Sequence, residues 1–212
     1  PCAVVMNGGR WLICANGTWP IPAVREPLVE QADVVVACDG AYDQCLEHGL
    51  LPHVVLGDMD SVQNTEKASG TRWVLKASQE KSDLSKAFEY AQEHDAKIID
   101  VIGVDGGALG HKIAPFFALY DAPSNTTLHL DGGRVLCVRN SSIAIDSIEI
   151  GSRISLFALG SANGVHLKGC QWGLDGDMLQ PGTQGLNNIA TLSKIEFTVE
   201  EGAVLVCIEP IK

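Results

Sequence analysis

The sequence predicts an α/β domain, with a mostly parallel sheet and crossover helices, followed by an all-β sandwich domain. The 212 residues suffice for two small domains, each with a core of its own. Strand-like runs alternate with helical periodicity up to about residue 122, and this periodicity stops after the turn signals at 121–125. We therefore expect domains at 1–124 and 125–212.

Apolar runs rich in β-branched residues predict the strands of the first domain, at 3–6, 33–38, 53–56, 73–75 and 97–104. One helix is predicted after Asp39, with apolar positions at 41, 42, 45 and 46. Another is predicted after Ser82, with an apolar face at 84, 87, 88 and 91. Asp39 and Ser82 are expected to be the N-caps of these helices. Strands alternating with helices predict a parallel sheet.

The second domain shows only short strand-like runs, at 126–130, 135–138, 143–145, 154–158, 165–167, 195–199 and 204–208. Glycines and polar turns separate these runs. Such spacing is typical of a β-sandwich.

Acidic residues follow the apolar run that ends at Gly57. Asp58 and Asp60 lie two residues apart, so in extended backbone both carboxylates point to one face, where they could hold Mg²⁺. An acidic turn is the alternative, since Asp, Gly and Ser are ordinary turn residues.

Two more acids stand near the ends of predicted strands. Asp39 follows one strand, and Asp83 precedes the helix after another. In open α/β sheets ligands bind beyond the carboxyl ends of the strands, so the three acidic segments predict one shared site. Helix capping for Asp39, and a favourable first-turn position for Asp83, are the alternatives.

Composition narrows the classes of function. A net charge of −11 argues against a broad nucleic-acid surface. No stretch is apolar and long enough to cross a membrane, and no signal peptide begins the sequence, so we expect a cytoplasmic protein. The seven cysteines have no zinc or redox spacing and are expected to be free thiols.

The familiar phosphate-binding signatures are absent, since no Gly-x-Gly-x-x-Gly follows a strand and no P-loop is found. The segment Gly8-Gly9-Arg10 could bind an anion or be a plain turn. Lys81, Lys86 and Lys112 are expected to be solvated, with compensation of a bound anion as the alternative.

The segments Asp39-Gly40-Ala41, Gly57-Asp58-Met59-Asp60-Ser61 and Gln79-Glu80-Lys81-Ser82-Asp83 occur in the order and spacing of a known family. Gly106-Gly107-Ala108-Leu109-Gly110-His111, Gly169-Cys170-Gln171-Trp172-Gly173-Leu174 and Gly185-Leu186-Asn187-Asn188 extend the match. The chain resembles the thiamine pyrophosphokinases. The central motif is fairly specific, while the outer ones are short.

The resemblance implies transfer of a diphosphoryl group from ATP to the hydroxyl of thiamine, with Mg²⁺ as cofactor and AMP as by-product. It also implies a homodimer whose sites lie at the subunit interface, with Trp172 reaching the site from a second subunit. The implied roles are catalysis and metal binding for Asp58, Asp60 and Asp83; substrate binding for Gln79, Trp172, Asn187 and Asn188; and nucleotide binding for Asp39, Gly40, Ser61 and His111.

The chain departs from the family pattern at several positions. Ala108 and Gly110 stand where arginine and aspartate are usual, Pro115 where asparagine is common, and Asn187 where serine is usual. Trp172 could instead be a sandwich-core residue. A diphosphokinase for another hydroxyalkyl heterocycle, such as a pterin, and a non-catalytic thiamine- or nucleotide-binding homologue therefore remain alternatives.

Overall fold

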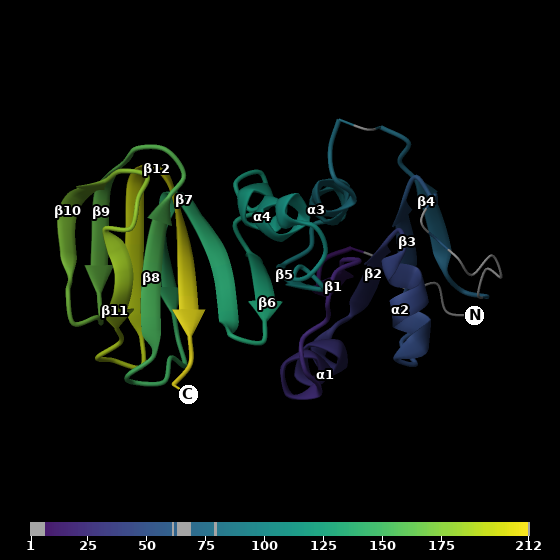
Figure 1. Cartoon of the computed structure of the whole chain (residues 1–212), viewed down its shortest axis with the longest axis horizontal. Helices are drawn as coiled ribbons and strands as arrows, with labels where there is room; N and C mark the ends of the chain where they lie inside the picture. Colours follow the sequence, from purple (N-terminus) through teal and green to yellow (C-terminus); the bar gives the residue numbers. More distant parts are fainter. Residues whose placement is uncertain (1–6, 61, 63–68, 79, 212) are drawn as a thin grey trace. The chain divides into compact units, whose positions relative to one another are not determined.

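The computed structural model describes residues 7–60, 62, 69–78 and 80–211. The chain divides into two compact units, Pro1–Asp131 and Gly132–Lys212 (Figure 1). This division lies later than the expected boundary at residue 124, because β6 (Thr126–Leu130) pairs in parallel with β5 (Ile98–Ile102) and so belongs to the first sheet.

The first unit contains a parallel sheet, and its strand order is β4-β3-β2-β1-β5-β6. Every neighbouring pair in this order is parallel, as the alternation of strands and helices predicted. The other strands are β1 (Arg10–Cys14), β2 (Val34–Cys38), β3 (Val54–Gly57) and β4 (Arg72–Leu75).

Helices cover both faces of this sheet. The alternating side chains of β1 show this, because they contact different helices on the two faces. The Trp11 ring packs against Tyr90 and His94 at the end of α3, with ring centroids 6.0 and 5.8 Å apart. Leu12 on the opposite face belongs to an apolar cluster with Leu28 of α1 and side chains of α2. The helices are α1 (Pro22–Gln31), α2 (Ala41–Glu47), α3 (Asp83–Glu93) and α4 (Leu109–Ala118).

The first strand and two of the helices differ from the sequence-based expectations. The strand predicted at 3–6 lies outside the described residues, and β1 occupies positions 10–14 instead. Arg10 therefore lies in a strand, where its Nε donates to Asp100 at 2.6 Å, rather than in an anion-binding turn. The helices α1 and α4 were not predicted, because Pro27 and Pro115 interrupt their sequences.

The two expected helix caps have different outcomes. The Ser82 hydroxyl accepts a hydrogen bond from the Ser85 N–H at 3.2 Å, so Ser82 caps α3 as predicted. The N-cap of α2 is Gly40, and Asp39 before it has a left-handed φ of 39°. The capping role expected for Asp39 is wrong, and its buried carboxylate needs another explanation.

The second unit is a sandwich of antiparallel strands. Two long strands, β7 (Gly133–Ile145) and β12 (Ile195–Glu209), pair along most of their lengths. The first half of β12 also pairs with β9, and its second half pairs with β8, so β12 contributes to both layers. The remaining strands are β8 (Arg153–Ala158), β9 (Ala162–Lys168), β10 (Leu174–Leu179) and β11 (Gly185–Ile189).

One apolar cluster forms the core of the second unit. It joins Ile154 and Leu156 of β8, Val165 and Leu167 of β9, and Phe197 of β12. Together the two units confirm the predicted fold class, an α/β unit followed by a β-rich one.

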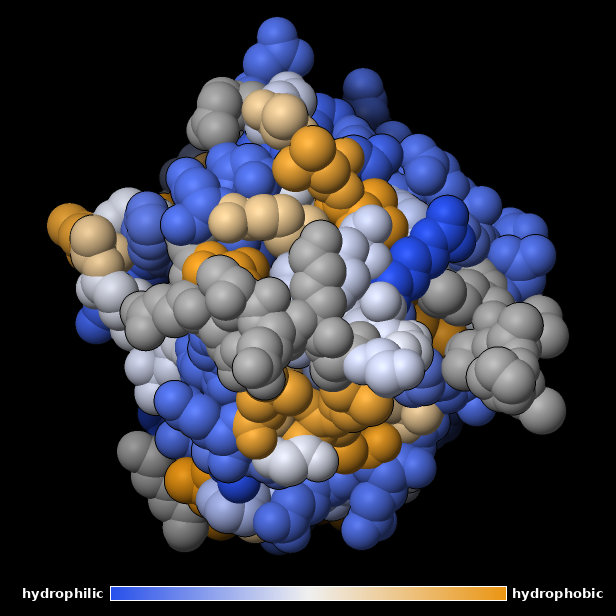
Figure 2. All heavy atoms as spheres, turned by 90° about the vertical axis from the view of Figure 1, so that its right-hand side faces the viewer, coloured by the Kyte–Doolittle hydropathy of each residue, from blue (hydrophilic) through white to orange (hydrophobic). Residues whose placement is uncertain are grey.

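The strand β4 ends the sheet order of the first unit. On this side of the molecule hydrophobic side chains gather in patches among hydrophilic ones (Figure 2). Leu75 of β4 is 67% exposed.

Within the described residues, no helix combines the length and the apolar character needed to span a membrane.

Candidate active site

The strand order places a topological switch point between β1 and β5. From β1 the sheet continues to β2 on one side and to β5 on the other. Ligands of open α/β sheets bind at such a point, outside the carboxyl ends of the strands. A cavity of about 630 Å³ lies there, and loops after β1, β2 and β5 contribute to its wall.

Glycines let two of these loops touch. The Gly17 N–H donates to the Gly103 carbonyl at 2.8 Å, and the Thr18 N–H donates to the Asp105 carbonyl at 2.6 Å. A Cβ at Gly17 would lie 2.2 Å from the Asp105 carbonyl oxygen, and one at Gly103 would lie 2.2 Å from the Ala15 carbonyl oxygen. Only glycine fits at these two positions, and the contact fixes one side of the cavity.

Three acids converge beside the cavity. Each of Asp39, Asp58 and Asp60 offers a carboxylate oxygen, and these oxygens lie within 4.8 Å of one another. Asp39 is buried, Asp58 is half-buried and Asp60 is exposed, so the cluster extends from the interior to solvent. Hard divalent cations such as Mg²⁺ prefer oxygen ligands, and this donor set fits them.

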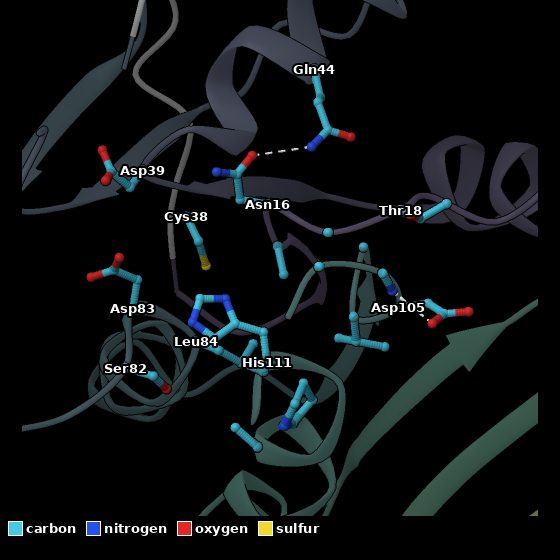
Figure 3. Close-up of a pocket in the computed structure, with 18 residues that line it drawn as sticks. Asn16, Thr18, Cys38, Asp39, Gln44, Ser82, Asp83, Leu84, Asp105 and His111 are labelled. Atoms are coloured by element: carbon cyan, nitrogen blue, oxygen red, sulfur yellow. Dashed lines mark hydrogen bonds between the residues drawn. The ribbon is translucent and has the colours of Figure 1, made fainter. Parts of the chain in front are cut away.

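The cavity brings several of the predicted residues together. Asp39, Asp83 and His111 all line it, although they come from the end of β2, the start of α3 and the first turn of α4. Figure 3 shows Asp39 and Asp83 on one side of the cavity and the His111 ring near its centre. Because Asp39 belongs to the acidic cluster as well, the cluster adjoins the cavity.

Sequence reasoning missed two polar residues of the cavity wall. Gln44 of α2 donates to the Asn16 side-chain oxygen at 3.1 Å (Figure 3). Asn16 follows β1, which was expected at 3–6, so its position near a strand end could not be recognised.

Asp83 is bound to a lysine. The Lys86 Nζ donates to Asp83 Oδ1 at 2.8 Å, and Lys86 is only 5% exposed. The expectation of a solvated Lys86 is wrong. The resemblance placed Asp83 among the metal ligands, but it lies outside the group formed by Asp39, Asp58 and Asp60.

The thiol of Cys38 also lines the cavity. Burial raises its pKa well above the ordinary value, and the negative charges of Asp83 and Asp39 raise it further. The thiol therefore stays protonated at neutral pH, which argues against a nucleophilic role. The cysteines of the described residues are free, as expected.

Three of the predicted substrate-binding residues, Trp172, Asn187 and Asn188, belong to the second unit. Trp172 is 57% exposed, so the core alternative for this side chain is wrong. The Asn188 side chain accepts from the Trp172 N–H at 3.1 Å and donates to its carbonyl at 2.6 Å. Asn187 is exposed with a φ of 63°, and it lies in an irregular part of β11 rather than in a turn.

The remaining positions of interest are two residues outside the described part of the chain, one glycine and two acids. Gln79 and Ser61 lie outside the described residues. A Cβ at Gly110 would meet nothing within 4 Å, so the acid missing there was not excluded by crowding. Two further acids have backbone partners, since Asp105 accepts from the Gly106 N–H and Asp131 accepts from the Ile21 N–H, both at 2.6 Å.

Comparison with known proteins agrees with this geometry. Residues 26–130 match the family model described as the catalytic domain of thiamin pyrophosphokinase. Over 80 residues the chain is 31% identical to the thiamine pyrophosphokinase of Bacillus subtilis (strain 168), and the matched segment spans 35% of this chain and 37% of that relative.

Solved structures show the same fold over almost the whole chain. The B. subtilis thiamine pyrophosphokinase has a TM-score of 0.80 at 21% identity, covering 96% of this chain and all of the other. The Candida albicans enzyme has a TM-score of 0.77 at 14% identity, covering 99% and 91%. The resemblance found in the motifs is thus confirmed, and residues 26–130 match the catalytic domain of the thiamin pyrophosphokinases.

Proposed function

We propose that the protein transfers the diphosphoryl group of ATP to the hydroxyl oxygen of thiamine, which gives thiamine diphosphate, AMP and one proton. One observation carries this proposal. The cluster of Asp39, Asp58 and Asp60 adjoins the switch-point cavity, and Asp39 belongs to both. A nucleotide in the cavity would therefore place its phosphates near an oxygen-rich cation site.

The acidic cluster is suited to Mg²⁺, held by Asp39, Asp58 and Asp60. When bound, the ion neutralises phosphate charge, which phosphoryl transfer requires. Without a cation, three carboxylates this close would repel an anionic nucleotide. Asp39 therefore gains a ligand role beyond the nucleotide contact expected from the resemblance.

Asp83 is the residue that we assign to the thiamine hydroxyl. Its carboxylate lies in the cavity wall, where it can accept a hydrogen bond from the alcohol and orient the oxygen for attack on the β-phosphorus. His111 and the backbone after Asp39 would contact the nucleotide, in line with the roles expected for His111 and Gly40.

Trp172, Asn187 and Asn188 are assigned to thiamine recognition. An exposed indole face can stack on the aminopyrimidine or attract the thiazolium cation. We propose that these residues act on the site of a second subunit in a homodimer. Exposed apolar residues on both units, including Leu109, Phe117 and Met178, support such an association.

The reaction is tested by measuring AMP release from Mg-ATP with a panel of alcohols. Thiamine should give the highest kcat/KM. A pterin alcohol that outperforms thiamine would instead support a diphosphokinase for another heterocycle. No AMP release with any alcohol in the panel would support a binding protein without turnover. The cytoplasmic location expected from the sequence stays a prediction.

The shared site is tested by complementation. Chains carrying Trp172→Ala are mixed with chains carrying Asp58→Asn, and heterodimers are isolated with two different tags. At thiamine concentrations well below KM, where chains of both parent variants are poorly active, one unmutated composite site should restore about half of the wild-type activity. Purified heterodimers with no restored activity would show that Trp172 and Asp58 do not meet across a subunit boundary.

A further inference from the structure

Lys86 is buried although lysine is rarely found in a protein interior. It lies on the inner side of α3, among the buried residues Leu84, Ala87 and Phe88. Removing an ammonium group from water costs free energy that a single ion pair does not always return. The same segment contains an ion pair with a smaller desolvation cost, because Lys81 pairs with Glu89 while both side chains remain exposed. Helix stability alone therefore does not explain why Lys86 is buried.

The position of Lys86 relative to the cavity indicates a reason for its burial. Asp83 lines the cavity, whereas Lys86 does not, so the ammonium group lies behind the carboxylate. Asp83 shares the cavity wall with Asp39 and Cys38 at the end of β2.

The contact with Lys86 involves only one of the two carboxylate oxygens of Asp83. Oδ1 accepts from Lys86 Nζ at 2.8 Å, and the Asp83 side chain is 31% exposed. Within the described part of the chain, no hydrogen bond to Oδ2 is found. A carboxylate held through one oxygen by a buried, immobile donor keeps the other oxygen in a defined orientation.

We propose that Lys86 is a positioning residue, which holds Asp83 from inside so that its second oxygen faces the substrate alcohol. This inference rests on the proposed function for its kinetic consequence, but the orientation of Asp83 can be observed without any turnover. The alternative is that Asp83 serves only as the counter-ion of Lys86.

The test uses Lys86→Met and Lys86→Arg in the full chain. Replacing a buried ion pair partner by an apolar side chain of similar length still leaves a carboxylate that reaches solvent, so Lys86→Met should fold. Its kcat should fall at least tenfold, while KM values for ATP and thiamine change less than threefold. Lys86→Arg should recover part of kcat. Lys81→Met, the same substitution at an exposed pair, is the matched control and should stay within twofold.

A double-mutant cycle separates positioning from stability. If Lys86 acts through Asp83, Lys86→Met should lower kcat little further in an Asp83→Asn background. An equal fold-loss in both backgrounds would contradict the proposal. So would a folded Lys86→Met variant with wild-type kcat.

Crystal structures of the wild type and Lys86→Met decide the case independently of the reaction. The Asp83 carboxylate should adopt a different orientation in the variant. An unchanged orientation would overturn the proposal, whatever the activity. If the wild type releases no AMP with thiamine, the proposed function fails, and this structural comparison still tests the role of Lys86.

Discussion

Two groups of acids in the first unit differ in how their charge is compensated. In the interior of the sheet, Asp100 accepts from Arg10 at 2.6 Å and from His129 at 2.7 Å. At the strand ends, Asp39, Asp58 and Asp60 instead bring like charges within 4.8 Å of one another. The first arrangement gives one acid a guanidinium and an imidazole as partners, while the second concentrates negative charge beside a cavity.

The two groups also differ in their position along the strands. Asp100 lies in the middle of β5, between β1 and β6, where it is buried and its charge is compensated within the protein. Beyond the strand ends, Asp39 lines the cavity and Asp60 is exposed, so this group can hold a ligand. The two groups should therefore respond in opposite ways to loss of charge.

The largest effect is expected at the cluster. Asp58→Asn and Asp60→Asn should each reduce turnover at least a hundredfold, because an amide coordinates a cation without adding negative charge. Stability should change by less than about 0.5 kcal/mol, since both positions are at least partly exposed. Steady-state kinetics and thermal melting measure both quantities. Normal turnover at saturating Mg²⁺ would remove these residues from the mechanism.

Asp100→Asn should show the reverse pattern. Burial acts to raise the pKa of Asp100, but hydrogen bonds from His129 and Arg10 outweigh it and lower the pKa below the ordinary value. The variant should lose about 2–4 kcal/mol of unfolding free energy at pH 7, because the half-buried Arg10 guanidinium keeps its charge without the carboxylate that compensates it. Once stability is allowed for, kcat should stay within threefold.

The pH dependence follows from the sign of that shift. A lowered pKa in the folded state stabilises fully above the unfolded-state value of about 3.9 and loses this contribution as pH falls through the folded value. Denaturant unfolding of wild type and Asp100→Asn should therefore converge below about pH 4. A constant difference from pH 7 to pH 3 would contradict the assignment.

Trp172 extends the comparison to the second unit with a smaller effect. Trp172→Ala should raise KM for thiamine about tenfold, which corresponds to about 1.4 kcal/mol, and leave KM for ATP nearly unchanged. Trp172→Phe should recover part of the loss. The exposure of this side chain predicts little change in melting temperature. A destabilisation of about 3–5 kcal/mol, typical of a truncated core residue, would contradict the exposed position of Trp172.

The smallest effect is expected for Asp105, a strand-end acid with a local partner. Asp105 Oδ1 accepts from the Gly106 N–H, and the oxygen of an asparagine can accept the same bond. Asp105→Asn should keep turnover within a few-fold. A loss above a hundredfold in a folded variant would show that strand-end acids with backbone partners can still be functional.

The sequence predicted the strands whose apolar runs are uninterrupted, such as β2 and β5, and the helix α3 with its Ser82 cap. It could not predict α1 and α4, whose prolines mask the helical pattern. It also placed β6 in the wrong unit, because a strand's partner is determined by tertiary pairing and not by its own residues.

For the site, acids at strand ends could be found from the sequence, because an apolar run followed by Asp is visible locally. Burial could not be found in this way. The sequence places Lys86 three residues after Asp83 on a helix, but only packing decides that this pair faces the sheet, whereas the Lys81 pair faces solvent. The convergence of Asn16 and Gln44 likewise depends on long-range topology.

Cation binding tests the central contrast most directly. Mn²⁺ shares the preference of Mg²⁺ for oxygen ligands and can be titrated into the full chain by electron paramagnetic resonance. Wild type and Asp100→Asn should bind Mn²⁺ equally, and Mg²⁺ should compete. Asp58→Asn should bind it at least tenfold more weakly. Equal binding by wild type and Asp58→Asn would contradict the assignment of Asp39, Asp58 and Asp60 as the cation site.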